Sequence, residues 1–180
     1  MNMLRTFLKA SVIAIVAGLP AKANEPVEPV KTLVDMASYN AGVESASDAV
    51  YSEYFSASML LNYFSEGFVD AYAQALIALR KEHDIMLFDH DPVLGGQESC
   101  VPKDVTYDAP QTIADVTVIK VRFKASWCYD GEYEGKNDVT EVTYRLVQED
   151  DEVGEKRFFI DDIQFVGRDS LRALLQPLAR

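Results

Sequence analysis

The sequence predicts an α+β domain in which N-terminal helices pack on an antiparallel sheet, with a short helix after the last strand. Between residues 30 and 82, apolar side chains recur at intervals of three or four, which is the spacing of one helix face. From Ala114 onward, apolar and polar residues alternate, as in a half-buried strand. Polar turns separate the alternating stretches, so consecutive strands are expected to be antiparallel neighbours.

Capping residues divide the helical half of the chain. The first helix is expected to end at Gly42, because glycine commonly follows a helix. Ser47 is the expected N-cap of a second, short helix, and residues 57–64 allow another turn or two. Ser65 is the expected N-cap of a third helix that ends near residue 82. The predicted apolar faces comprise Val30, Leu33, Val34, Ala37 and Ala41, then Val50, Tyr51, Tyr54 and Phe55, then Phe68, Tyr72, Leu76 and Leu79.

Residues 83–114 are expected to be irregular, with short extended pieces at 85–88 and 104–107. The alternation of apolar and polar residues after Ala114 predicts three long strands. The third strand covers residues 157–167, and a closing helix covers 170–176. The apolar faces of the first two strands are Thr117, Ile119, Val121, Phe123, Ala125 and Trp127, and Val142, Tyr144 and Leu146. We expect Trp127 and Tyr144 to belong to the core. The opposite face carries a basic stripe, Lys120, Arg122 and Lys124, which is either a contact surface or the solvated face of the sheet.

Residues 1–23 have the pattern of a secretory signal peptide. Two basic residues precede a short apolar run, and Ala21-Lys22-Ala23 precedes Asn24, so cleavage is expected between Ala23 and Asn24. The apolar run is shorter than the roughly 18 residues that span a membrane, which leaves an uncleaved anchor as the weaker alternative. No cysteine lies near the cleavage site, so we expect a periplasmic or secreted protein that is not a lipoprotein.

The expected mature chain is strongly acidic. Residues 1–23 hold three of the 17 basic residues and none of the 29 acidic ones, so the remainder carries a net charge of −15. Nucleic acids and anionic membranes need a basic surface, so we expect no nucleic-acid partner and no stable membrane insertion after cleavage. A polar lead-in, residues 24–29, is followed by one domain, residues 30–180, which is a suitable length for a single core.

The two cysteines, Cys100 and Cys128, are expected to form one disulfide, as is usual for a cysteine pair in an exported protein. A redox or metal-binding pair is the alternative, but the chain has no C-x-x-C motif. We therefore expect no metal site and no cofactor at these cysteines or elsewhere.

The stretch FDHDPVLGGQESC, residues 88–100, is the densest cluster of polar chemistry in the chain. Extended backbone would turn Asp89 and Asp91 to one face and His90 to the other, so a metal site would need Glu82, His83 or Glu98 as well. The alternative is a structured turn, in which Asp91 accepts backbone N–H groups ahead of Pro92. Gly95 and Gly96 would then supply unusual dihedral angles. Gln97, Glu98 and Tyr144 are further candidate ligand-binding residues, beside Asp91.

A pair of aspartates interrupts the third strand between two apolar residues. Ile160 and Ile163 are three positions apart, which strict alternation cannot place on one face. Either a β-bulge lets both point inward, or one of Asp161 and Asp162 faces a cavity and acts as a general base or acid. In the structural alternative, Asp161 caps the closing helix or bridges to Arg168 or Arg172. The candidate catalytic residues are therefore Asp162, Asp161 and His90.

The segment FFIDDIQFVGRDSLRALL, residues 158–175, resembles the ending of an uncharacterised bacterial family, domain-of-unknown-function family 3828. Asp89-His90-Asp91-Pro92 followed by Gln97-Glu98, and an early helical Tyr63-Phe64-Ser65, are also similar to elements of that family. The resemblance covers residues 30–175, and the cysteine pair departs from it. It implies a fold like nuclear transport factor 2: a curved antiparallel sheet closed by helices into a cone with a cavity.

Relatives of that fold include both dehydratases and non-catalytic binding domains, so the fold does not choose the function. No nucleophile elbow, P-loop or dinucleotide motif is present in the sequence. We therefore expect a non-catalytic binding domain that holds a small molecule in the cone or contacts an envelope protein, as an immunity or inhibitor protein does. The alternatives are a cofactor-free dehydratase or isomerase that uses an aspartate, and a metal-stabilised domain built on His90, Asp91 and Glu98.

Overall fold

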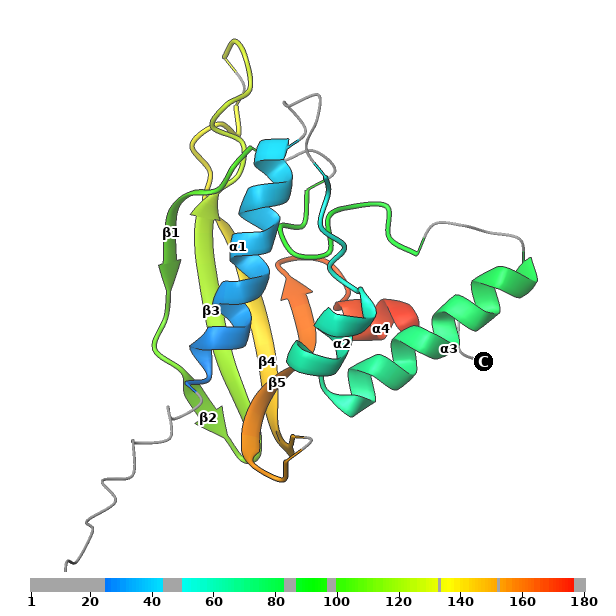
Figure 1. The fold of residues 1–180 in the computed structure, drawn as a ribbon. Helices are drawn as coiled ribbons and strands as arrows, with labels where there is room; N and C mark the ends of the chain where they lie inside the picture. The colour runs from blue at the N-terminus through cyan, green and yellow to red at the C-terminus, as the bar shows by residue number, and fades with distance from the viewer. Residues whose placement is uncertain are drawn as a thin grey trace, which may run out of the picture.

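The computed structural model describes residues 25–43, 50–82, 87–96, 100–132, 134–151 and 153–176, and it confirms the α+β class (Figure 1). Three helices precede the sheet and one follows it, in the order that the sequence predicts. The helices are α1 Val27–Val43, α2 Ala57–Tyr63, α3 Glu66–Glu82 and α4 Leu171–Leu175. The strands are β1 Lys103–Tyr107, β2 Gln111–Ile113, β3 Val116–Lys124, β4 Thr140–Asp150 and β5 Lys156–Phe165.

All strand pairs in the sheet are antiparallel. The order is β1-β3-β4-β5, and β2 pairs with the beginning of β3. The meander of β3, β4 and β5 is the predicted one, and β1 matches the expected extended piece at 104–107, whereas β2 was not expected. Helix α1 lies along one face of the sheet, while α2, α3 and α4 gather beside β5 (Figure 1). No helix in the described ranges is both long and apolar enough to cross a bilayer.

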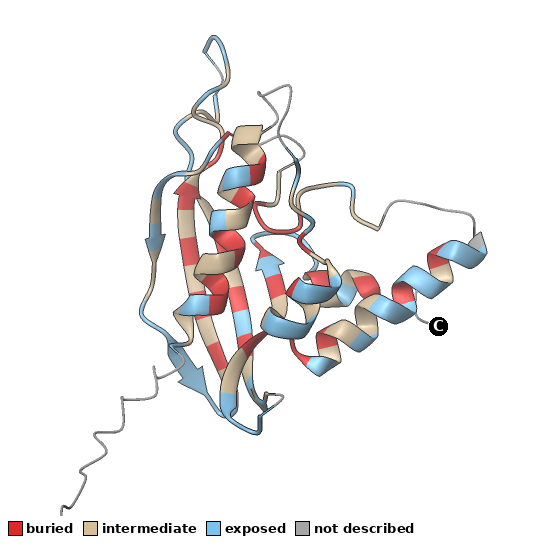
Figure 2. Cartoon of the chain, in the orientation of Figure 1, coloured by how far each residue is buried: buried red, intermediate tan, exposed pale blue. Residues whose placement is uncertain are grey.

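The core lies between this sheet face and the helices (Figure 2). β3 alternates between buried and half-buried positions along its whole length, and the predicted apolar side chains that lie within β3 and β4 are buried. Between α3 and the segment that follows α1, aromatic rings contact one another in a continuous cluster of Phe55, Phe64, Phe68, Tyr72 and Phe88. Phe64 and Phe68 are buried, and the other three rings pack against the core.

Carboxylates neutralise the basic stripe on the opposite sheet face. Lys120 and Arg122 both bind Glu141, at 2.8 and 2.7 Å, and Arg122 also binds Asp108 at 2.6 Å. Lys124 binds Asp104 at 2.9 Å. Because each cation has its partner on the same sheet, the solvated-face interpretation fits the stripe better than a contact surface does.

The two aspartates of β5 sit at a β-bulge, which was one of the two predicted alternatives. The register shifts opposite Arg145 and Leu146, which pair with Asp162 and Ile160 and leave Asp161 as the extra residue. Ile160 and Ile163 are both fully buried as a result.

The prediction of a second helix is wrong over residues 50–55, which are not helical. Its expected N-cap, Ser47, lies outside the described residues. The side chain of Asn40, which is itself buried, accepts a hydrogen bond from the backbone N–H of Ser52 and donates one to its carbonyl, both at 2.9 Å. These bonds hold the segment against α1 in a non-helical conformation, so the apolar spacing around Tyr54 did not determine the local structure. Helix α2 begins after Ser56, whose side chain accepts from the N–H of Met59.

Four residues of the predicted apolar faces lie outside the core. Val50 and Tyr51, in the segment that is not helical, are 78% and 51% exposed. Leu76 is 39% exposed, because the buried line of α3 follows Phe68, Ala75 and Leu79, and Leu76 is about 100° further around the helix. Trp127 is half-buried beyond the end of β3, where its Nε1–H donates to the carbonyl of Val101 at 2.9 Å. Trp127 therefore packs over the end of β3 and does not belong to the core.

A disulfide joins Cys100 to Cys128, as predicted. The backbone N–H of Cys100 also donates to the carbonyl of Ala125 at 2.8 Å, so the two segments meet beyond the end of β3. The expected signal peptide and its cleavage position, Ala23 and Asn24, lie outside the described residues.

Candidate functional site

The stretch from Asp89 to Gly96 is a turn, as the structural alternative predicts. One carboxylate oxygen of Asp91 accepts the N–H groups of Val93 and Leu94 at 2.7 and 2.6 Å, and the other accepts the hydroxyl of Tyr54 at 2.7 Å. Backbone bonds between Asp91 and the two glycines close the turn. Asp91 is therefore a structural acceptor that binds the turn to the segment after α1.

Asp89 and His90 bind each other and do not alternate as they would in a strand. The Nδ1 atom of His90 lies 2.6 Å from an oxygen of Asp89, and this hydrogen bond lowers the pKa of the Asp89 carboxyl. The imidazole is only 8% exposed, and its ring meets that of Phe165 edge to face at 5.7 Å. Its Nε2 atom is buried without a hydrogen-bond partner in the described structure. An imidazole held in this way has one nitrogen fixed and one unused.

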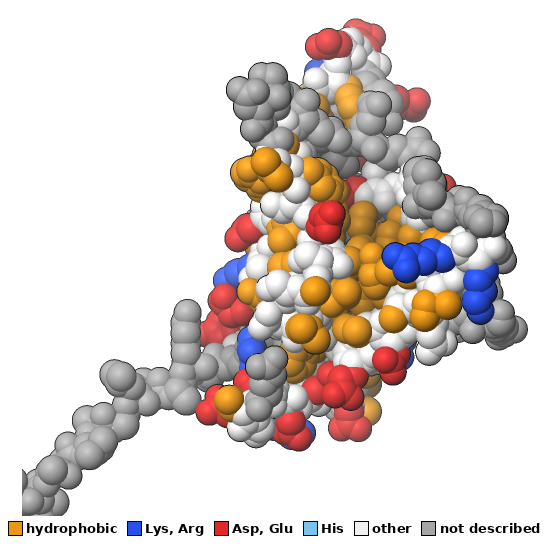
Figure 3. Space-filling view, turned by 45° about the vertical axis from the view of Figure 1, so that its right-hand side comes forward, with side chains coloured by type: hydrophobic (Ala, Val, Ile, Leu, Met, Phe, Trp, Pro, Cys, Tyr) orange, Lys and Arg blue, Asp and Glu red, His pale blue; other side chains and the backbone are white. Residues whose placement is uncertain are grey.

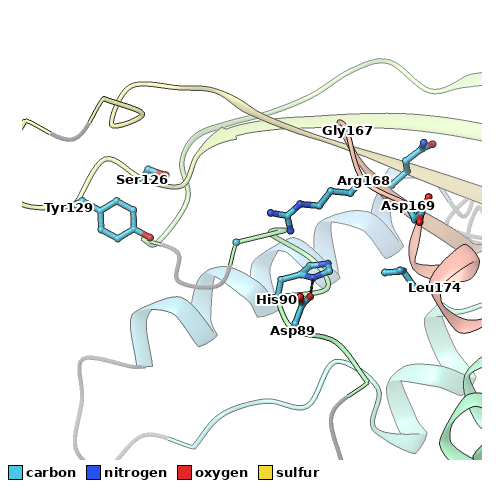
Figure 4. Close-up of a pocket in the computed structure, with 10 residues that line it drawn as sticks. Asp89, His90, Ser126, Tyr129, Gly167, Arg168, Asp169 and Leu174 are labelled. Atoms are coloured by element: carbon cyan, nitrogen blue, oxygen red, sulfur yellow. Dashed lines mark hydrogen bonds and ion pairs between the residues drawn. The ribbon is translucent and has the colours of Figure 1, made fainter. Parts of the chain in front are cut away.

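An open hollow of about 1380 Å³ lies beside this turn (Figure 4). Three segments line it: the turn, the segment after β3, and the segment from the end of β5 into α4. The polar residues of the lining are Asp89, His90, Ser126, Tyr129, Gln164, Arg168 and Asp169. Because the hollow is wide and polar, it suits a polar ligand or an extended chain segment more than an enclosed apolar molecule.

Arg168 extends from the segment after β5 toward the turn, with Ser126 and Tyr129 beyond it (Figure 4). Its Nη1–H donates to the carbonyl of Gly95 at 2.8 Å. Arg168 forms no ion pair with the described carboxylates, although its charge contributes to the low pKa of Asp89. The guanidinium is therefore oriented by a neutral backbone group and retains donors for an anionic ligand.

The two aspartates of β5 lie at the junction with α3 and α4. Asp161 accepts the hydroxyl of Ser65 at 2.7 Å and forms an ion pair with Arg172. Asp162 accepts the backbone N–H groups of Ile163 and Arg172, at 2.9 and 3.0 Å. Arg172, and not Arg168, is the basic partner of Asp161. These bonds are the structural arrangement that the sequence offers as an alternative to catalysis; a catalytic role for either residue stays a prediction.

Tyr144 belongs to the core and does not line the hollow. It is fully buried in β4, and burial, followed by the nearby Asp91 and Tyr107, raises its pKa well above the usual range. Its hydroxyl has no hydrogen-bond partner in the described structure. The predicted site residues thus separate: Asp89 and His90 reach the hollow, Asp91 supports it, and Tyr144 is remote from it. Gln97 and Glu98 lie outside the described residues, within which no group of three or more His, Cys, Asp or Glu side chains is arranged to hold a metal ion.

Most of the residues that line the hollow were not predicted from the sequence. Ser126, Tyr129, Gln164 and Asp169 match no motif and lie on loops or at a strand end. The disulfide was the available signal, because pairing Cys100 with Cys128 brings the turn and its glycines close to Ser126. Residues adjacent in sequence to two bonded cysteines lie close together in space, even when the sequence around them contains no motif.

Comparison with known proteins identifies no relative: no family model, curated protein or solved structure matches this chain. The function is therefore argued from the site alone.

Proposed function

We propose that this chain is an exported, non-catalytic binding protein that holds an anionic group of its ligand in the hollow beside the Asp89–His90 turn. The single observation that carries the proposal is the orientation of Arg168, which the Gly95 carbonyl holds at 2.8 Å. Serine, tyrosine and glutamine side chains around the same hollow add neutral hydrogen-bonding groups. A carboxylate is the expected anionic group, since a guanidinium binds it through two parallel hydrogen bonds.

We place binding at this hollow and not inside a cone. Buried apolar side chains of the helices and of the sheet face that they cover belong to one core cluster. An open surface site favours a segment of an envelope protein over a small molecule as the ligand, so the proposed role is that of an immunity or inhibitor protein. The fold like nuclear transport factor 2 and membership of family 3828 stay part of the proposal. Helices on one face of an antiparallel sheet support the first.

Export is supported by the disulfide, because such bonds persist mainly in oxidising compartments. It also agrees with the signal-peptide pattern of residues 1–23. The full chain, expressed with these residues, should therefore accumulate in the periplasm or the medium. Its mass should begin at Asn24 and be two hydrogens below that of the reduced chain.

Native mass spectrometry of that exported protein tests the binding site. The wild type should carry an additional mass, either a small molecule or a protein, which Arg168→Gln loses. Arg145→Gln is the matched control, because Arg145 is an exposed arginine on β4 outside the hollow, and it should keep the mass. A bound species that survives Arg168→Gln, or a protein that carries none even after crosslinking in cells through position 126, would contradict the proposal.

The alternative, a dehydratase or isomerase that uses Asp161 or Asp162, makes an opposite prediction. Both carboxylates already accept hydrogen bonds from the N-cap of α3, from β5 or from α4. If the protein is a binding protein, Asp162→Asn should therefore change the stability of the fold and leave ligand binding at the hollow unchanged. Turnover of a bound small molecule that disappears in Asp162→Asn would favour the enzyme instead.

A further inference from the structure

The outward face of α3 carries charged and apolar side chains in a regular order. Going along this face from the N-terminus, Glu66 and Asp70 are followed by Ala73 and Ile77, and then by Arg80 and Lys81. From Glu66 to Arg80 the positions are four, three, four and three residues apart, and Lys81 is four residues after Ile77, so all six share one side of the helix. All six are exposed, and the side that holds Phe68, Ala75 and Leu79 faces the core.

The apolar centre of this face is exposed to solvent. Ile77 is 57% exposed, and its neighbour Leu76 is 39% exposed. Figure 3 shows this side of the molecule, with apolar side chains gathered between acidic and basic ones. The helix dipole accounts for acidic residues at the beginning of α3 and basic ones at its end, but it does not account for the apolar centre.

From this order we propose that α3 is the contact surface for a second copy of this chain, with the two helices antiparallel across a two-fold axis. In that arrangement Ala73 of one chain lies opposite Ile77 of the other, and Asp70 lies opposite Arg80 and Lys81. A parallel arrangement would instead place Asp70 against Asp70. The face is thus complementary to itself in one orientation only, which is what an isologous interface requires.

The charges on this face are available for such a contact. None of Glu66, Asp70, Arg80 and Lys81 takes part in an ion pair with the rest of the described chain. A helix of 17 residues is about 25 Å long, so a pair of them buries less than the roughly 1,600 Å² of a standard stable interface. The dimer is therefore reversible and depends on concentration. It is independent of the hollow, which lies elsewhere on the chain.

Sedimentation equilibrium of the exported full chain, over a wide concentration range, measures this association. The wild type should pass from monomer to dimer, and Ile77→Glu should weaken the dimer by about tenfold or more by placing a carboxylate in the apolar centre. Ile113→Glu is the matched control, because Ile113 is 71% exposed on β2, and it should not change the association. A protein that is monomeric throughout, or a dimer that Ile77→Glu leaves unchanged, overturns the proposal.

Charge reversal tests the antiparallel orientation. Asp70→Lys should weaken the dimer, and the triple variant Asp70→Lys with Arg80→Glu and Lys81→Glu should restore it, because the opposing charges are then reversed on both chains. A destabilised monomer does not produce such a rescue, and circular dichroism melting checks the fold of each variant. Failure of the rescue in folded variants overturns the antiparallel geometry.

A cross-link provides a second, independent measure of orientation. When chains with Ala73→Cys are mixed with chains with Ile77→Cys and oxidised gently, the 73–77 link between different chains should dominate. A majority of 73–73 or 77–77 links would instead show a parallel pair and overturn the proposal.

Discussion

Asp161 and Arg172 form an ion pair that ties the bulge of β5 to α4. The same carboxylate accepts the hydroxyl of Ser65, and the Ser65 Oγ accepts the N–H of Phe68 as the N-cap of α3. One aspartate thus connects a strand with the first residues of two helices, and Ser65 itself is fully buried. The bulge is what turns this carboxylate toward both helices while its neighbouring isoleucines stay in the core.

Arg172→Ala should destabilise the fold by about 1–3 kcal/mol, because it removes a charge-assisted hydrogen bond to a carboxylate that is mostly shielded from water. The side chain of Asp161 is only 21% exposed, so water replaces the lost donor incompletely. Urea unfolding measures the change. Arg145→Ala, at an exposed arginine of β4, should stay within about 0.5 kcal/mol of the wild type. Equal effects of the two variants would contradict a structural role for the pair.

Asp91→Ala should destabilise the fold by about 2–4 kcal/mol, since it leaves the N–H groups of Val93 and Leu94 and the hydroxyl of Tyr54 without their acceptor. Tyr54→Phe removes only the hydroxyl and keeps the turn intact, so about 1 kcal/mol is expected. Thermal melting of both variants compares the two losses of stability. A larger loss of stability for Tyr54→Phe than for Asp91→Ala would contradict this order, because the hydroxyl would then contribute more than the whole set of bonds to the Asp91 carboxylate.

Reduction of the disulfide should lower the melting temperature. Cys100 and Cys128 are 28 residues apart, and closing a loop of that size in the unfolded chain corresponds to about 3–4 kcal/mol in the loop-entropy model. The variant Cys100→Ala with Cys128→Ala should melt at the temperature of the reduced wild type, and reductant should leave it unchanged. A thiol assay on the unfolded, unreduced protein should find no free thiol; two free thiols would contradict the bond.

Acid should weaken the sheet through Glu141. Hydrogen bonds from Lys120, and then from Arg122, lower the pKa of this carboxyl below its ordinary value of 4.5. A carboxyl whose pKa is lower in the folded state stabilises that state above pH 4.5 and loses its contribution as the pH falls through the folded pKa. Melting temperatures measured between pH 6 and 3 should therefore fall less steeply below pH 4.5 for Glu141→Gln than for the wild type. Identical slopes would show that Glu141 does not contribute to the acid sensitivity.

Local patterns in the sequence predicted the features that depend on neighbours along the chain. The Ser65 cap and the alternation in β3 each follow from a few adjacent residues, and the spacing of Ile160 and Ile163 left the bulge as one of two alternatives. The contacts that form the candidate site join residues far apart, such as Tyr54 with Asp91 at a separation of 37 and Gly95 with Arg168 at 73. Side-chain polarity does not specify the partner of a residue, so neither contact was predictable.

The same limit explains the errors within elements. A helical spacing fits Phe68 with Tyr72 and Leu76 as well as it fits Phe68 with Ala75 and Leu79. Only the position of the neighbouring elements decides which of these lines is buried. For residues 50–55, the side chain of Asn40 supplied backbone hydrogen bonds that competed with helix formation.

Gly95 should tolerate a methyl group poorly. Its φ of 79° lies in the left-handed region, and a Cβ atom there would come within 2.5 Å of the ring of Phe165. That ring also contacts His90, so Gly95→Ala should both strain the turn and displace the imidazole at the hollow, at a cost of about 2–4 kcal/mol. Gly154→Ala is the matched control: Gly154 has the same φ of 79°, but nothing lies within 4 Å of its added Cβ.

Only the backbone term, about 1–2 kcal/mol, is expected for Gly154→Ala. Urea unfolding of the two variants therefore separates the cost of the dihedral angle from the cost of the contact with Phe165. The nuclear magnetic resonance signal of the His90 ring should shift in Gly95→Ala and stay in place in Gly154→Ala. Equal stability losses, with an unmoved His90 signal, would mean that the ring of Phe165 yields freely and that Gly95 is needed for its dihedral angle alone.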